Sequence, residues 1–181
     1  MALKIKSTTI LGVRLKGLIA MGGDGQVTFG DMALKQKAVK VRKFKIEKGE
    51  ILGGFAGAAA DALTLFEKFE GKIDEYEGDL KRSVVELAKE WRTDKYLRHL
   101  DALLALMDKT SSFIVSGDGN VIEPDGVVVA IGSGGGFAQS AATAFIQSTG
   151  YSAPKVVEKS LNIAADLCIY TNHSITVLTS K

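Results

Sequence analysis

Residues 9–22 read TILGVRLKGLIAMG, two apolar runs on either side of the pair Lys16-Gly17. Short runs rich in β-branched and large apolar residues, separated by a turn signal, are typical of a β-hairpin. We therefore expect the chain to enter its fold through two antiparallel strands, Thr9–Leu15 and Leu18–Gly22.

The rest of the chain is expected to form four helices and further strands. Two helical stretches follow the first strands; one is Ala58–Glu70, and the other starts at Asp79 and extends its apolar stripe through Leu97, Leu100, Leu104 and Met107. Later helices are expected over Phe137–Gln147 and from Ser152, as its cap, towards Tyr170. The remaining expected strands are Val27–Phe29, Val39–Ile46, Glu50–Phe55, Ser112–Ser116, Val121–Glu123, Val127–Ile131 and Ser174–Leu178.

The order of these elements indicates the fold class. Strands come first, then two helices, more strands, two more helices and a last strand. Grouped strands and paired helices favour antiparallel sheets covered by helices, an α+β fold, over alternating βαβ units. The chain of 181 residues is long enough for one domain with a real core, which we place at 8–181 after a short pro-segment, 1–7.

Composition excludes several classes of protein. Lys+Arg 23 against Asp+Glu 21 gives a net charge of +2, which indicates neither a nucleic-acid partner nor a membrane surface. The lysine-rich stretch 35–48 has little interleaved aromatic character and is typical of an exposed sheet edge. Cys168 is the only cysteine, so there is no intrachain disulfide, and a reducing, cytosolic compartment is expected.

A spaced trio carries the strongest chemical signal. Thr8, Asp24 and Lys40 are separated by sixteen residues in each step. If residues 1–7 are removed, Thr8 gains an α-amine, which titrates at about pH 7.7–8.0 in model peptides and can act as the base for its own hydroxyl. An acid and a lysine are what such a site needs to tune the proton transfer. The alternative is that Thr8 and Thr9 only open a strand.

The glycine run 132–136 invites a nucleotide interpretation. It follows an apolar strand and precedes a helix, but Phe137 stands where a dinucleotide fingerprint needs glycine, and the P-loop motif occurs nowhere in the chain. We expect this run to allow a close backbone approach and to present the Ser133 hydroxyl near a site, and we expect no nucleotide to bind.

These motifs together resemble the HslV family, the peptidase subunits of the bacterial HslUV protease. The resemblance covers the chain from Thr8 to about His173. It is carried by the trio with its flanking residues and by the segments Gly54–Gly57, Leu87–Asp94, Ala130–Gly135 and Cys168–His173.

The resemblance implies a fold, an assembly and partners. The fold would be the N-terminal nucleophile hydrolase sandwich of proteasome β-subunits, four layers in the order αββα with two antiparallel sheets. The subunits would form two stacked six-membered rings and degrade unfolded proteins delivered by an HslU-type ATPase. An unprocessed, non-catalytic ring subunit of the same fold remains the alternative.

The resemblance also implies roles for single residues. Thr8 would be the nucleophile of a threonine endopeptidase, with Asp24 and Lys40 supporting it, the Gly57 N–H as the oxyanion donor, and Ser133 near the terminal amine. A sodium ion would be held by main-chain oxygens of Ala165, Cys168 and Thr171, although the family usually has glycine where this chain has Ala165. Because seven residues precede Thr8, their removal would be autocatalytic or need another protease.

Overall fold

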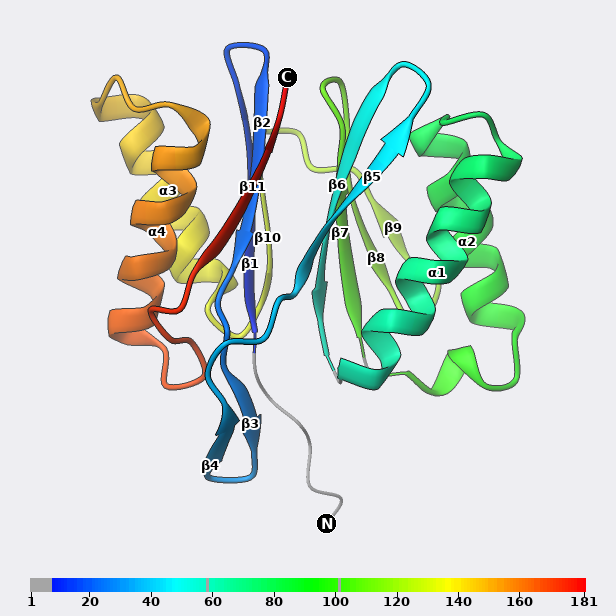
Figure 1. Cartoon of the computed structure of the whole chain (residues 1–181), viewed down its shortest axis with the longest axis horizontal. Coiled ribbons are helices and arrows are strands. Elements are labelled where there is room, and N and C mark those ends of the chain that lie inside the picture. Colours follow the sequence, from blue (N-terminus) through cyan, green and yellow to red (C-terminus); the bar gives the residue numbers. More distant parts are fainter. Residues whose placement is uncertain (1–7, 58, 101) are drawn as a thin grey trace.

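The computed structural model describes residues 8–57, 59–100 and 102–181 and has four layers, a helix pair, two sheets and a second helix pair (Figure 1). One sheet has the strand order β10-β1-β2-β11 and the other β5-β6-β7-β8-β9. Neighbouring strands in both sheets are antiparallel. The expected α+β fold with its αββα order is therefore confirmed. The expected pro-segment 1–7 lies outside the described residues.

The strands are mostly short; in the first sheet β10 and β11 flank the β1–β2 hairpin, whereas the second sheet pairs its strands in chain order. The first sheet contains β1 (Thr9–Leu15), β2 (Leu18–Gly23), β10 (Val128–Gly132) and β11 (Thr176–Ser180). The second contains β5 (Val41–Ile46), β6 (Gly49–Ala56), β7 (Leu103–Met107), β8 (Ser112–Ser116) and β9 (Val121–Ile122). A separate two-stranded hairpin is made of β3 (Val27–Phe29) and β4 (Met32–Lys35).

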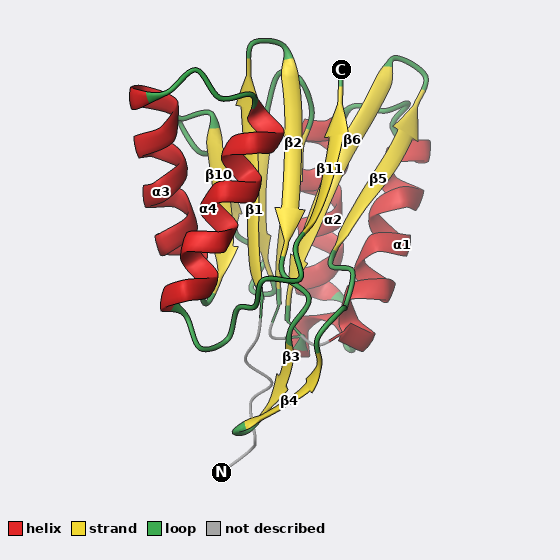
Figure 2. Ribbon diagram, turned by 60° about the vertical axis from the view of Figure 1, so that its left-hand side comes forward, coloured by secondary structure: helices red, strands yellow, loops and turns green. Residues whose placement is uncertain are grey.

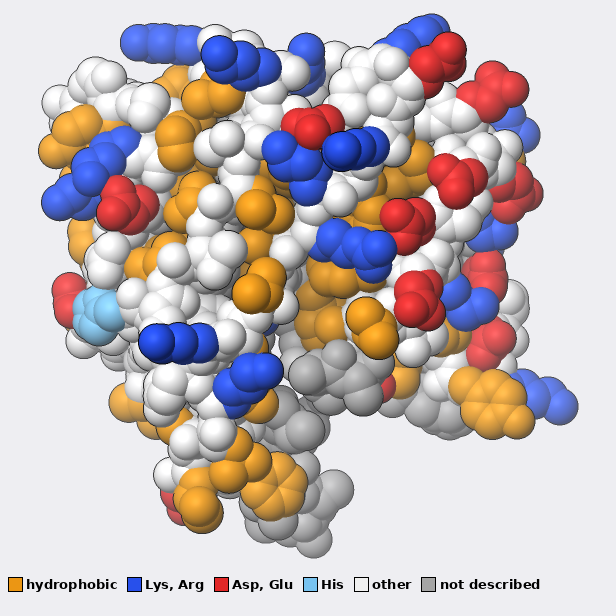
Figure 3. Space-filling model, viewed as in Figure 1, with side chains coloured by type: hydrophobic (Ala, Val, Ile, Leu, Met, Phe, Trp, Pro, Cys, Tyr) orange, Lys and Arg blue, Asp and Glu red, His pale blue; other side chains and the backbone are white. Residues whose placement is uncertain are grey.

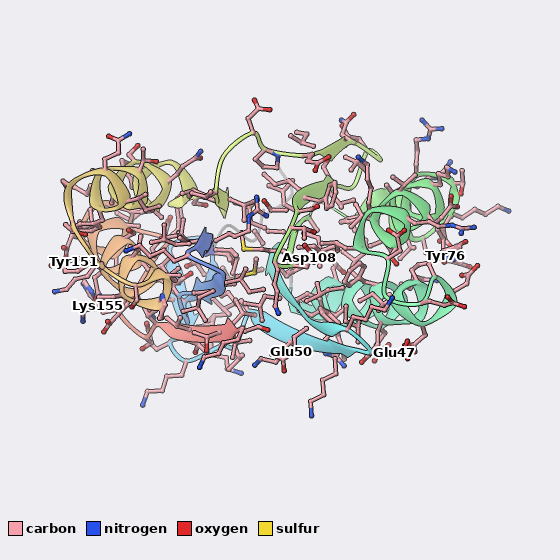
Figure 4. The ribbon with its side chains drawn as sticks, turned by 90° about the horizontal axis from the view of Figure 1, so that it is seen from above. Glu47, Glu50, Tyr76, Asp108, Tyr151 and Lys155 are labelled. Atoms are coloured by element: carbon pink, nitrogen blue, oxygen red, sulfur yellow. The ribbon has the colours of Figure 1, made fainter. Side chains whose placement is uncertain are left out.

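The helices bury one apolar face each against a sheet. They are α1 (Ala59–Glu75), α2 (Leu80–Thr93), α3 (Gly135–Ser148) and α4 (Ala153–Leu167). In α1 and α2, Phe69 and Trp91 belong to a cluster that covers the second sheet, whereas Val157 and Leu161 of α4 cover the first. Figure 4 views the sandwich from above, with Tyr76 on the side of α1 and α2 and Tyr151 on the opposite side.

A third apolar cluster lies between the two sheets. Ile10 and Met21 of the first sheet pack there with Leu52 and Met107 of the second, and all four are fully buried. The register places the start of β1 opposite the ends of β2 and β10, and the start of β5 opposite the end of β6. Thr8 before β1, Lys40 before β5 and Gly57 after β6 line one pocket, so these strand ends of the two sheets meet at one edge of the sandwich, which carries the candidate site.

The helical stripe expected from Asp79 to Met107 is wrong in its second half. The α2 helix ends at Thr93, because the carboxylate of Asp94 accepts hydrogen bonds from the N–H groups of Tyr96 and Leu97 and starts a new turn. A short 3-10 helix follows at Leu97–His99, and β7 then forms a central strand of the second sheet. An apolar run of this kind fits a buried strand and a buried helix equally well by periodicity.

One strand was missed, and several elements differ from their expected bounds: α1 ends at Glu75 instead of Glu70, β5 begins at Val41 instead of Val39, and β11 is Thr176–Ser180 instead of Ser174–Leu178. The β4 strand was not expected from the sequence. The β3–β4 hairpin projects from the body (Figure 2), and apolar side chains are exposed on it (Figure 3). They are Phe29 of β3 and Met32 and Leu34 of β4. Ser152 stands at the expected cap of α4 but makes no side-chain capping bond, and α4 ends at Leu167 instead of running towards Tyr170. Among the described residues, no helix combines the length and apolar character that a membrane crossing requires.

Candidate active site

A buried ion pair forms the centre of the site. Asp24 follows β2 and is fully buried, and Lys40 precedes β5 and is 9% exposed. The Lys40 ammonium nitrogen lies 3.1 Å from Oδ1 of Asp24 and donates a second hydrogen bond, 2.5 Å long, to the carbonyl oxygen of Gln26. Two members of the trio that the sequence singled out are therefore in direct contact.

The Asp24 carboxylate is surrounded by main-chain donors. The N–H of Thr9 donates to Oδ1 at 2.8 Å, and the N–H groups of Gln26 and Asn172 donate to Oδ2 at 2.9 and 3.4 Å. A buried charge is costly unless it is paired and hydrogen-bonded, and Asp24 is both. These bonds fix the carboxylate relative to β1, which begins one residue after Thr8.

Burial lowers the pKa of the Lys40 ammonium below its usual range, and this effect is larger than the opposing one from the nearby Asp24 carboxylate. The cause is desolvation, because a charged amine loses its hydration shell when it is buried. Lys40 is thus a lysine whose proton is held less tightly than usual, next to a threonine at the start of a strand. Perturbed groups of this kind concentrate at functional sites.

Thr8, the third member of the trio, shares a pocket with Lys40. It is 1% exposed and lines a small pocket of about 70 Å³ together with Lys40 and Gly57. The other lining residues share an apolar side chain: Val27, Ala38, Val39, Phe55 and Ala62. The pocket therefore brings Thr8, Lys40 and Gly57 together beside an apolar wall.

The backbone at Thr8 has an unusual conformation. Its φ angle is 147°, in the region that β-branched residues rarely adopt. Its carbonyl oxygen accepts a hydrogen bond of 2.9 Å from the N–H of Ser133, which fixes the residue from the β10 side.

The glycine run explains how this close approach is possible. Gly132 has φ of +89°, and a Cβ atom there would collide with the carbonyl of Thr8. A Cβ on Gly134 would collide with the Thr9 hydroxyl, which instead accepts the Gly134 N–H at 3.0 Å. The close backbone approach expected at residues 132–136 is confirmed. Ser133 is exposed, and its described contact with Thr8 is made by its main chain.

The residues expected to hold sodium lie at the end of α4 and beyond it. Ala165 is in the last turn, Cys168 is the C-cap residue, and Thr171 donates its N–H to the Cys168 carbonyl at 3.0 Å. The Thr171 hydroxyl lies 2.7 Å from the hydroxyl of Thr9. This segment is therefore packed directly under the start of β1, beside the trio.

Three polar residues of the site were not given a role by the sequence. The carbonyl of Gln26 accepts the Lys40 ammonium, Thr9 donates to Asp24, and Asn172 donates to the same carboxylate. All three residues make these bonds with main-chain atoms, and Asn172 lies about 150 positions away from Asp24. The one available signal was the occurrence of all three inside the quoted motifs.

Comparison with known proteins agrees with this arrangement. The family described as "Proteasome subunit" matches residues 5–179. A crystal structure of eukaryotic HslV from Trypanosoma brucei is 44% identical in sequence, with a TM-score of 0.87, and the match covers 94% of this chain and 98% of that chain. Because the family model matches almost the whole chain, the chain belongs to the proteasome subunit family, as an HslV-like peptidase of the N-terminal threonine type.

Proposed function

We propose that this chain is a catalytically active threonine endopeptidase, the proteolytic subunit of an HslUV-type protease, and that the peptide bond between Ser7 and Thr8 is cut to expose the nucleophile. The observation that carries the proposal is that Thr8, Lys40 and Gly57 line one pocket, with Lys40 bound to a fully buried Asp24.

The first chemical step follows from these contacts. Once Thr8 is the first residue, its Oγ1 attacks the carbonyl carbon of the substrate, and its own α-amine accepts the hydroxyl proton, directly or through a water molecule. Two of the three Lys40 N–H donors are used by Asp24 and Gln26, which leaves one for a group in the pocket that Lys40 lines together with Thr8. The positive charge of Lys40 favours the neutral, basic form of the neighbouring amine.

The second half of the reaction releases both products. The oxyanion of the tetrahedral intermediate accepts the N–H of Gly57, and one such donor contributes about 3 kcal/mol of barrier lowering. The amine then returns its proton to the leaving nitrogen, and an ester forms between the substrate acyl group and Oγ1. A water molecule, deprotonated by the same amine, hydrolyses this ester and restores Thr8.

The assembly and partners are part of the proposal. Subunits form two stacked six-membered rings that enclose the pockets, and an HslU-type ATPase delivers unfolded proteins to them in the cytosol. Support comes from the similarity to HslV over 94% of the chain, and the single unpaired Cys168 suits a reducing compartment.

Mass spectrometry tests processing and assembly in one sample. Under native conditions we expect a particle of twelve subunits, and after denaturation each active subunit should begin at Thr8. The same sample should hydrolyse an unstructured peptide. If every subunit retains Met1–Ser7 and no peptide is cleaved, the chain is the alternative, an unprocessed non-catalytic ring subunit.

A sodium ion at the end of α4 is a further part of the proposal, and the donor set fits it. The Ala165 carbonyl lies in the last turn, where carbonyls lack an intrahelical partner and the helix terminus carries partial negative charge. The Cys168 carbonyl accepts one N–H, from Thr171, and keeps a second lone pair for a cation. Carbonyl ligation does not depend on the side chain, so Ala165 in place of glycine keeps the ligand atom.

Removal of sodium should lower the thermal stability of the protein. A ligand that binds only the folded state stabilises it by mass action, so exchange of sodium chloride for choline chloride at equal ionic strength should lower the unfolding midpoint by roughly 5 °C. Returning sodium should restore it. An unchanged midpoint, measured by differential scanning fluorimetry, would remove sodium from the proposal and leave the peptidase assignment intact.

A further inference from the structure

The connection between α4 and β11 contacts the catalytic centre at three points. The Ile169 carbonyl accepts the side-chain amide of Gln26 at 2.9 Å, the Thr171 and Thr9 hydroxyls are 2.7 Å apart, and the Asn172 N–H donates to Asp24. Figure 1 shows this orange-to-red connection next to the blue chain that leads from β2 into β3. Segments far apart in the sequence thus meet behind the Asp24–Lys40 pair.

The Asn172 side chain is hydrogen-bonded to three residues: Gly25, Gln36 and Ser174. Its Oδ1 accepts the N–H of Gly25 at 3.0 Å and that of Ser174 at 3.1 Å. Its Nδ2 donates to the main-chain carbonyl of Gln36 at 2.9 Å and to the side-chain oxygen of Gln36 at 2.7 Å. Both donors and both acceptor positions of the amide are therefore in use.

These bonds act on Asp24 from two directions. The main chain of Asn172 donates to the Asp24 carboxylate, and its side chain binds the N–H of Gly25, the next residue along the chain. Asp24 therefore has both its side chain and its adjoining main chain attached to one residue. Since Asp24 in turn holds the Lys40 ammonium, the position of Lys40 depends on the same attachment.

We propose that Asn172 is a positioning residue for peptide hydrolysis, which acts by fixing Asp24 and, through it, the Lys40 ammonium beside Thr8. The inference rests on the proposed function, because it has a meaning only for a chain that hydrolyses peptides. It requires no contact between Asn172 and the substrate, and Asn172 is not among the residues that line the pocket.

The first test is Asn172→Ala, with the kinetics expressed per active site. Active sites are counted by stoichiometric labelling with a peptide epoxyketone, which reacts with an N-terminal threonine. We expect kcat per labelled site to fall by about 10- to 100-fold, the effect of a small misplacement of catalytic groups. KM should stay within about twofold because the pocket walls are untouched. A merely structural role would reduce the number of labelled sites and leave kcat per site unchanged.

Gln36→Ala is the matched control for the amide network. It removes one acceptor of the Asn172 side chain but leaves the bonds to Gly25 and to Asp24 in place. We expect kcat per site within about twofold of the original chain, since a single exposed contact contributes little. A loss equal to that of Asn172→Ala would show that the contact with the Gln36 side chain, and not the bonds to Gly25 and Asp24, is responsible, and it would overturn the proposal.

Asn172→Asp provides a readout that does not depend on the alanine variant folding. It keeps both acceptor contacts and the size of the side chain, but it replaces the two donations to Gln36 by a carboxylate oxygen facing two oxygen atoms. It also adds a negative charge next to Asp24. The Thr8 amine would be faced by the charges of Lys40 and Asp24, so a further negative charge raises the pKa of this amine. The acid limb of the kcat/KM profile should therefore move to higher pH.

The outcomes distinguish failure of the proposed function from failure of the positioning role of Asn172. If the unsubstituted protein hydrolyses no peptide, the proposed function fails. If it is active while Asn172→Ala keeps kcat per site, the positioning role of Asn172 is overturned and the peptidase assignment stands. If the alanine variant yields no labelled sites, kcat per site of Asn172→Asp at its own pH optimum decides: a fall of about 10-fold or more supports the positioning role, and a value within about twofold of the original chain overturns it.

Discussion

Replacement of Thr8 by alanine is expected to reduce peptide hydrolysis more than any other single change, by more than about a thousandfold, because no other group can form the acyl ester. The rings should still assemble, since the change removes only the hydroxyl and one methyl group just before the start of β1, and the described bond of Thr8 to the glycine run uses its carbonyl. Hydrolysis of a fluorogenic peptide, together with native mass spectrometry, checks both expectations.

The control must separate chemistry from processing, because a chain without the hydroxyl also cannot cut itself before residue 8. A fusion whose removal leaves residue 8 as the first residue gives Thr8→Ala and the original sequence with the same terminus. Thr8→Ser in the same format should keep measurable activity, since it retains a hydroxyl and an α-amine. Undiminished hydrolysis by the alanine form would refute the assignment of the nucleophile.

The second large effect is expected from Lys40→Met. It removes the charge that tunes the proton transfer at Thr8, and we expect kcat to fall by about 100- to 10,000-fold. It also leaves the fully buried Asp24 carboxylate without its cation. Breaking a buried pair in this way costs about 3–5 kcal/mol, so the unfolding midpoint should fall as well. Both quantities are measured on the same preparation.

Lys43→Met is the matched control for Lys40→Met. It makes the same substitution three residues later, on β5, at a lysine that is paired with Glu50 on the solvated side of the strand. Peptide hydrolysis should stay within about twofold and the midpoint should change little, as for most surface ion pairs. If Lys40→Met hydrolyses peptide at the rate of this control, Lys40 has no part in the reaction.

The sequence was most informative about the edge of the sandwich where the site lies. The hairpin at residues 9–22 was confirmed with its turn at Lys16-Gly17, and two members of the trio, Asp24 and Lys40, are in contact. Spacing alone left strand opening as the alternative, and the resemblance to the HslV family selected the trio. The glycine run was also interpreted correctly as a place of close approach, since Gly132 touches Thr8.

Periodicity was insufficient where burial or long-range contacts decide. The lysine-rich stretch 35–48 was interpreted as an exposed sheet edge, and only the fold shows that Lys40 within it is buried, with its ammonium bonded to Asp24 and Gln26. The run at Leu103–Met107 was expected to be helical, because a central strand and a buried helix face have the same apolar character. The contacts of Asn172 depend on the packing of α4 and could not be inferred from local sequence.

The φ angle of 147° at Thr8 affects the free-energy change for cleavage of the peptide bond before Thr8. A conformation of this kind costs about 1–3 kcal/mol for a residue with a β-branched side chain, and the surrounding fold has to supply that energy while the chain is continuous. A residue at a free amino end has no φ torsion. Hydrolysis before Thr8 would remove this strained torsion together with the peptide bond. Re-forming the bond would have to restore the strain. The strain in the uncleaved chain therefore lowers the free energy of the cleaved chain relative to it.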